Sequence, residues 1–144
     1  MDVRGNQPAR LWLTGLGALV GALVANVALW WVSTAALAIP PEFPPLVGPA
    51  PTIFFTAIGV GGGVVAFAII CRFFDHPVRL FRRVAAAALV LSLVPDIWLW
   101  SDGAGAQFPG ASIAAVSVLM LMHILAAGIV VWVMTGVGRY PQAG

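Results

Sequence analysis

The stretch Thr52–Cys71, with the sequence TIFFTAIGVGGGVVAFAIIC, contains no charged side chain. A transmembrane helix needs about 20 mainly apolar residues to cross the hydrocarbon core of a bilayer. A segment inside that core can satisfy its backbone polar groups only as a helix or as part of a closed barrel. The stretch lacks the alternating pattern of a barrel strand. It therefore predicts a membrane-spanning helix.

Three further apolar stretches predict spans at residues 11–39, 84–100 and 111–137, and the helix of the 84–100 span can start near Pro77. The chain is 61% hydrophobic and 8% charged, with a mean hydropathy of +1.01. A soluble domain has about 25% charged residues. We therefore expect an all-α, polytopic membrane protein whose residues 1–144 form a single four-helix transmembrane bundle.

The first span could also be read as a secretory signal peptide, because Ala36–Ala38 resembles a cleavage site. A signal peptide has an apolar region of about 7–15 residues, which is much shorter than the stretch 11–39. We therefore expect the segment to be retained as a span.

Arginine is the only basic residue apart from two histidines, and its distribution predicts the orientation. The loop between the second and third spans has four arginines, and the outer loops have none. Positive residues favour the cytoplasmic side. We expect a multi-pass protein of the bacterial inner (cytoplasmic) membrane with both termini in the cytoplasm. The arginines concerned are Arg4, Arg10, Arg72, Arg79, Arg82, Arg83 and Arg139.

Both long connections have features that suggest their structure. Residues 39–51 contain six prolines, which predicts an extended outer loop, either a stiff connector or a docking surface for a partner. In the cytoplasmic loop, Asp75 is placed to cap a helix that starts at Pro77. We expect Phe81 to enter the membrane interface while Arg72, Arg79, Arg82 and Arg83 contact lipid headgroups.

Glycines spaced four residues apart predict close helix packing. Gly17 and Gly21 form such a pair in the first span, as do Gly59 and Gly63 in the second. Small residues at this spacing let helix backbones approach closely in lipid. The contacts could lie within the monomer or between subunits.

Each predicted span also contains one polar residue at a similar depth: Asn26, Thr56, Asp96 and His123. Ionisable groups inside a membrane are costly and often functional. The four residues could form a structural hydrogen-bonded cluster or a proton-linked or ligand-binding site. Alternatively, Asp96 could simply reach the outer headgroups.

The segments Leu91–Asp96 (LSLVPD) and Met120–Ala127 (MLMHILAA) give the third and fourth spans a family resemblance. The chain resembles the small bacterial and archaeal four-helix membrane proteins of domain of unknown function 6069. The resemblance implies a four-helix architecture and no assigned activity. It also implies that Pro95, Asp96, Met122 and His123 belong to a shared pattern.

The sequence contains no complete catalytic motif, so we do not expect an enzyme. One intramembrane histidine cannot supply bis-histidine haem ligation in a monomer, and Cys71 alone cannot form a disulfide or a cysteine zinc site. We expect no metal, no cofactor and no nucleic acid. The favoured function is a non-enzymatic accessory or interaction subunit, with a membrane protein partner or a homo-oligomer in the lipid bilayer. The alternative is a small transporter or proton-linked ligand-binding protein using Asp96 and His123.

Overall fold

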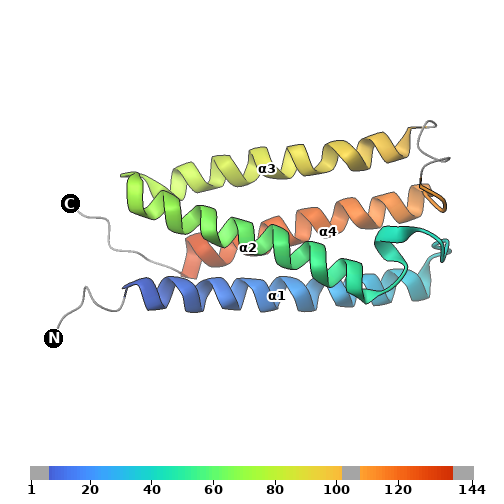
Figure 1. The fold of residues 1–144 in the computed structure, drawn as a ribbon, viewed down its shortest axis with the longest axis horizontal. Coiled ribbons are helices and arrows are strands. Elements are labelled where there is room, and N and C mark those ends of the chain that lie inside the picture. The colour runs from blue at the N-terminus through green and yellow to red at the C-terminus, as the bar shows by residue number, and fades with distance from the viewer. Residues whose placement is uncertain (1–6, 102–107, 138–144) are drawn as a thin grey trace.

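Four long helices run side by side in the computed structural model, which describes residues 7–101 and 108–137 (Figure 1). They are α1 (Gln7–Ala36), α2 (Pro49–Phe73), α3 (Pro77–Trp100) and α4 (Ile113–Trp132). A 3₁₀ turn, η1 (Pro44–Leu46), precedes α2, and a π-helical turn, η2 (Val133–Val137), follows α4. No strand occurs among these residues, which confirms the all-α fold class.

Three of the helices are long and apolar enough to cross a membrane: Ala9–Ala36, Pro49–Phe73 and Ile113–Gly136. The chain is therefore a helical membrane protein with multiple candidate spans, and it contacts the lipid bilayer. The remaining helix, α3, begins with a segment that contains Arg79, Arg82 and Arg83, which makes it more polar. It lies alongside α4 in the bundle (Figure 1). Its crossing of the membrane stays a prediction.

The packing order brings the arginine-bearing segments together. Helix α1 packs against α2 and α4, whereas α3 packs mainly against α4 and to a lesser extent against α2. The start of α1, the α2–α3 connection and the last turn of α4 lie at one end of the bundle (Figure 1). We call this the arginine end. Its cytoplasmic location stays a prediction, and Arg4, Asp102 and Arg139 lie outside the described residues.

Prolines and a cap determine several helix boundaries. Helix α1 ends at Ala36, before residue 39, because a residue that precedes a proline disfavours the helical conformation and Pro40 follows. Helix α2 starts at Pro49, where proline is tolerated in the first turn. Helix α4 begins after Ser112, whose hydroxyl accepts a hydrogen bond from the backbone nitrogen of Ala115 at 3.2 Å.

The predicted cap at Asp75 is wrong. Helix α3 does begin at Pro77, but the residue in the capping position is His76, and its side chain makes no capping hydrogen bond. The proline at the first helical position has no amide that needs a partner, which reduces the need for such a cap.

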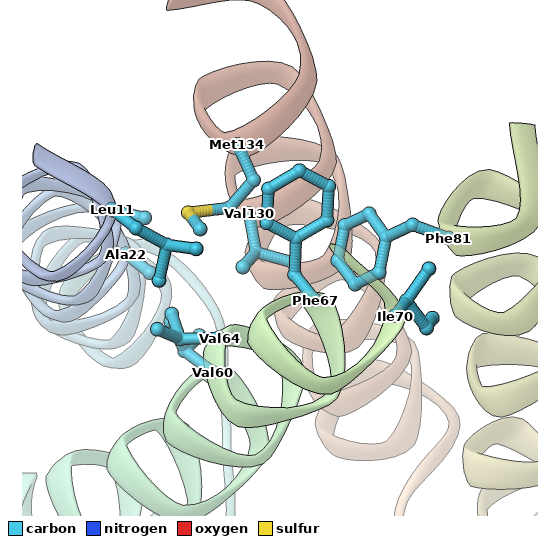
Figure 2. Close-up of a cluster of buried hydrophobic side chains, with 10 residues drawn as sticks. Leu11, Ala22, Val60, Val64, Phe67, Ile70, Phe81, Val130 and Met134 are labelled. Atoms are coloured by element: carbon cyan, nitrogen blue, oxygen red, sulfur yellow. The ribbon is translucent and has the colours of Figure 1, made fainter. Parts of the chain in front are cut away.

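Aromatic side chains fill the core near the arginine end. Phe67 of α2 and Phe81 of α3 pack edge to face with ring centroids 4.8 Å apart, beside Met134 of η2 (Figure 2). Phe81 is only 1% exposed, so its predicted position in the membrane interface is wrong. A phenylalanine ring in the core removes more apolar surface from water than one in the membrane interface. The edge-to-face geometry of the aromatic pair is itself favourable.

The connection between α1 and α2 is folded back onto the opposite end of the bundle. Phe43 and Leu46 are buried, and the indole Nε1 of Trp30 donates to the carbonyl of Leu46 at 3.0 Å. Gly110 packs against this loop with φ = +79°, where an added Cβ would lie 2.9 Å from the Phe43 backbone nitrogen. The predicted extended conformation is wrong at η1 and in the first turn of α2. The loop covers the bundle end instead of only connecting two helices.

Candidate functional site

The site centres on a contact between the two ionisable side chains inside the bundle. Asp96 lies in α3 directly after Pro95 and is 2% exposed. His123 lies in α4, which packs along α3. The histidine Nδ1 is 3.0 Å from the aspartate Oδ2. Within residues 7–101 and 108–137, this is the single contact between an acidic and a basic side chain at salt-bridge distance. The helices thus bring together two groups that are 27 residues apart in sequence.

A second acceptor competes for the same ring nitrogen. His123 Nδ1 also lies 2.9 Å from the backbone carbonyl oxygen of Leu119, one helical turn earlier. Because a carbonyl oxygen only accepts, this contact is favourable when Nδ1 carries a proton. Asp96 Oδ2 approaches the ring closely but has no well-aligned hydrogen bond. One N–H group therefore faces two acceptors, and its hydrogen-bond geometry is better to the carbonyl of Leu119 than to the carboxylate of Asp96.

The two partners differ greatly in exposure. The side chain of Asp96 is 3% exposed, whereas that of His123 is 35% exposed. The carboxyl group is thus enclosed by the helices, and the imidazole extends from it to the surface of the bundle. Imidazole carries two nitrogens, so one ring can bind or release a proton at either of them.

A second polar pair lies between α1 and α2. The amide Nδ2 of Asn26 donates to the hydroxyl of Thr56 at 2.9 Å and lies 3.4 Å from the carbonyl oxygen of Met122 in α4. Asn26 Oδ1 and the hydroxyl of Thr52, one turn before Thr56, are buried and have no hydrogen-bond partner. Such groups carry a desolvation cost, so this region is polar but incompletely satisfied.

The four predicted polar side chains therefore lie as two pairs. Within the described part of the chain, no hydrogen bond joins the Asn26–Thr56 pair to the Asp96–His123 pair. Helix α4 connects the pairs through its own backbone, since Met122 and His123 are consecutive. Sequence reasoning found the residues and their common level, but it did not separate them into pairs.

The predicted glycines divide into two groups. An added Cβ at Gly63 would lie 3.5 Å from Val130, and one at Gly21 would lie 3.8 Å from Ile129. Gly17 and Gly59 have open space at the Cβ position. The last two therefore do not make the close helix contacts within the bundle.

Sequence reasoning missed the most closely packed helical glycine. An added Cβ at Gly15 would lie 2.5 Å from Cγ1 of Val64, at the contact of α1 with α2. Gly15 shares a helix face with the buried residues Leu11, Ala18 and Ala22. That spacing of four, three and four residues was the available signal, because it marks one side of a helix.

The arginines of the α2–α3 connection are exposed at the arginine end. Arg82 is oriented by η2, because its Nη2 donates to the hydroxyl of Thr135 at 3.2 Å. The guanidinium of Arg72 lies 5.9 Å from the centre of the Phe73 ring.

Across the described ranges, no group of three histidine, cysteine or acidic side chains is placed to hold a metal ion.

The sequence model of a family described as "Family of unknown function (DUF6069)" matches residues 6–140. No curated protein and no solved structure matches the chain.

Proposed function

Because the chain belongs to the family of unknown function DUF6069, whose description names no activity, we propose a function from the intramembrane site itself. The chain acts as a proton-linked membrane protein in which Asp96 and His123 together hold one exchangeable proton. The observation that carries this proposal is the 3.0 Å contact between the two groups inside the bundle.

The cost of burial supports a functional role for the pair. An ionisable side chain in a membrane span is expensive and usually pairs with another polar group. An ionised aspartate beside an imidazolium and a protonated aspartate beside a neutral imidazole have the same net charge. Both states keep one proton on the pair. Loss of that proton would leave a single buried negative charge, which is much less favourable.

The two acceptors near the ring nitrogen Nδ1 provide a way to move this proton. The Nδ1–H group lies between the carbonyl of Leu119 and the carboxyl group of Asp96, at 2.9 Å and 3.0 Å. A small rotation of the ring would transfer the hydrogen bond from the carbonyl to the carboxylate. The partly exposed side of His123 then exchanges its proton outside the α3–α4 contact.

A flux measurement tests this proposal. Purified protein is reconstituted into vesicles that contain a pH-sensitive dye, and a potassium diffusion potential drives proton entry. We expect faster acidification than in empty vesicles, a loss of this excess in Asp96→Asn, and little change in Asp75→Asn. Asp75 is a suitable control because it is exposed in the α2–α3 connection. Wild-type flux equal to that of empty vesicles would contradict the proposal that the pair carries protons across the membrane.

A second candidate is the accessory or interaction subunit, which is favoured by the outward-facing glycines. Gly17 of α1 and Gly59 of α2 are exposed and have open space at the Cβ position. Small residues on an outer helix surface allow another transmembrane helix to approach closely. The partner is another membrane protein or a second copy of the chain, and no catalysed reaction is involved in either proposal.

Two leucine substitutions test this second candidate. Gly59→Leu should leave the unfolding temperature of the monomer nearly unchanged and reduce co-purification or self-association. Gly63→Leu is the matched control, because it would collide with Val130 and should destabilise the monomer itself. Unchanged association in Gly59→Leu would exclude this face as the interface.

A further inference from the structure

The arginines at the start of α3 share one helix face. Arg79, Arg82 and Arg83 are spaced by three and four residues, which places their side chains next to one another. Phe81 points into the core against Phe67 (Figure 2), so the rotation of α3 is fixed. Residues 79 and 83 therefore lie on the side of the helix away from the core.

A hydrogen bond to η2 holds the side chain of Arg82, one of the three arginines on this face. The Thr135 hydroxyl donates to the carbonyl of Val131 at 2.8 Å and accepts from Arg82 at 3.2 Å. Thr135 lies in the π-helical turn η2, a rare distortion that is frequent at functional sites. A guanidinium has five N–H donors, so Arg82 keeps most of them for another acceptor.

This positive face has no acidic partner in the part of the chain that the structure describes. None of its arginines makes an ion pair with a carboxylate, and the first turn of α3 contains no acidic residue. Like charges at these spacings repel one another. The positive end of the α3 dipole adds to the field, so a bound anion would be stabilised by both effects.

The position of the arginines along α3 indicates which anion they would bind. The three arginines lie within the first seven residues of α3, which corresponds to about 10 Å of a helix about 36 Å long. That is the level of lipid headgroups when the rest of the helix crosses the hydrocarbon core. The neighbouring Phe73 and Phe74 are exposed apolar rings, which suit the same interface.

We propose that Arg79, Arg82 and Arg83, with Arg82 held by Thr135, bind the phosphodiester of an anionic glycerophospholipid at the α3–α4 junction. Arginine pairs well with phosphate because its donors can engage two oxygens at once. The bound lipid would brace α3 against η2 at the arginine end. The site is separate from the Asp96–His123 pair.

A lipid titration of the full chain in a neutral detergent tests this site. Phosphatidylglycerol should raise the unfolding temperature, whereas phosphatidylcholine should have little effect. The concentration for half the effect should rise about five-fold in Arg82→Gln, the change expected for losing one arginine near an anionic surface. Thr135→Val keeps every charge but removes the acceptor, and it should shift the titration in the same direction.

Arg72→Gln is the matched control, because it removes one positive charge from the end of α2 instead of from the α3 face. Its titration should stay close to wild type. An equal shift in Arg72→Gln and Arg82→Gln, or none in Thr135→Val, would overturn the site in favour of general charge attraction. Equal stabilisation by inorganic phosphate at the same concentration would overturn the lipid as its occupant.

Discussion

Met122 and His123, consecutive residues of α4, contact two different helices. The carbonyl oxygen of Met122 lies 3.4 Å from Asn26 of α1, and the ring of His123 lies 3.0 Å from Asp96 of α3. The first contact uses the main chain of α4 and the second uses a side chain, so one turn of the helix serves both neighbours. Helix α4 is therefore the element through which the two polar pairs can influence one another.

The direct contact of Asp96 with His123 predicts non-additive stability. The variants Asp96→Asn, His123→Gln and the double variant are compared by thermal or denaturant unfolding in detergent. We expect an interaction energy of at least ~0.5 kcal/mol, as is usual for residues in contact. The same cycle between Asp96 and Thr56, which lie in separate pairs, should be nearly additive. Additivity in both cycles would exclude the contact.

The Asn26–Thr56 hydrogen bond predicts different effects of two substitutions at position 56. Thr56→Val preserves the shape but removes the acceptor of Asn26 Nδ2, and it should destabilise the protein by about 0.5–2 kcal/mol. Thr56→Ser keeps the hydroxyl and should lose less stability. Unfolding measurements that rank serine below valine would contradict this assignment.

Gly15 and Gly17 provide a test of packing within one helix. Gly15→Ala would bring a methyl group into buried Val64 and should destabilise by about 1–3 kcal/mol. Gly17→Ala points into open space and should leave the free energy of unfolding unchanged or raise it by up to about 1 kcal/mol, because alanine favours a helix more than glycine does. Equal losses for the two variants would mean that α1 packs through another face.

The orientation of the bundle can be tested with single cysteines. In a Cys71→Ser background, Glu42→Cys and Arg79→Cys place exposed thiols at opposite ends of the bundle. An impermeant thiol reagent applied to intact cells should label position 42 only, because the arginine end is expected in the cytoplasm. Labelling of position 79 alone would invert the topology.

The helices and the depth of their polar residues were predictable from sequence, because the hydrocarbon core of a membrane disfavours unpaired backbone groups and polar side chains. Long uncharged runs must be helical, and polar residues such as Asn26 and Asp96 stand out against an apolar background. Their partners were less visible. Four residues at one depth are compatible with one cluster or two pairs, and the rotation of each helix about its axis decides between them.

Local packing accounts for the features that sequence reasoning missed. Phe81 follows Arg79 and precedes Arg82, so it resembles an interfacial residue until α2 is seen to supply Phe67 as its partner. Gly15 lies outside the Gly17–Gly21 pair and depends on Val64 of another helix. Burial of Phe43 likewise depends on residues of α3 and α4, such as Leu99 and Val116, in the same apolar cluster. Each of these facts is a contact between distant segments, which local patterns do not encode.

Infrared difference spectroscopy tests the central claim that Asp96 and His123 share an exchangeable proton. Spectra of the reconstituted protein are recorded across about pH 5 to 8, where histidine ordinarily changes its charge. We expect a pH-dependent band of a buried carboxyl group that disappears in Asp96→Asn, persists in Asp75→Asn and shifts its midpoint in His123→Gln. A spectrum without any Asp96-dependent change in this range, or with a midpoint unaffected by His123→Gln, would contradict the account.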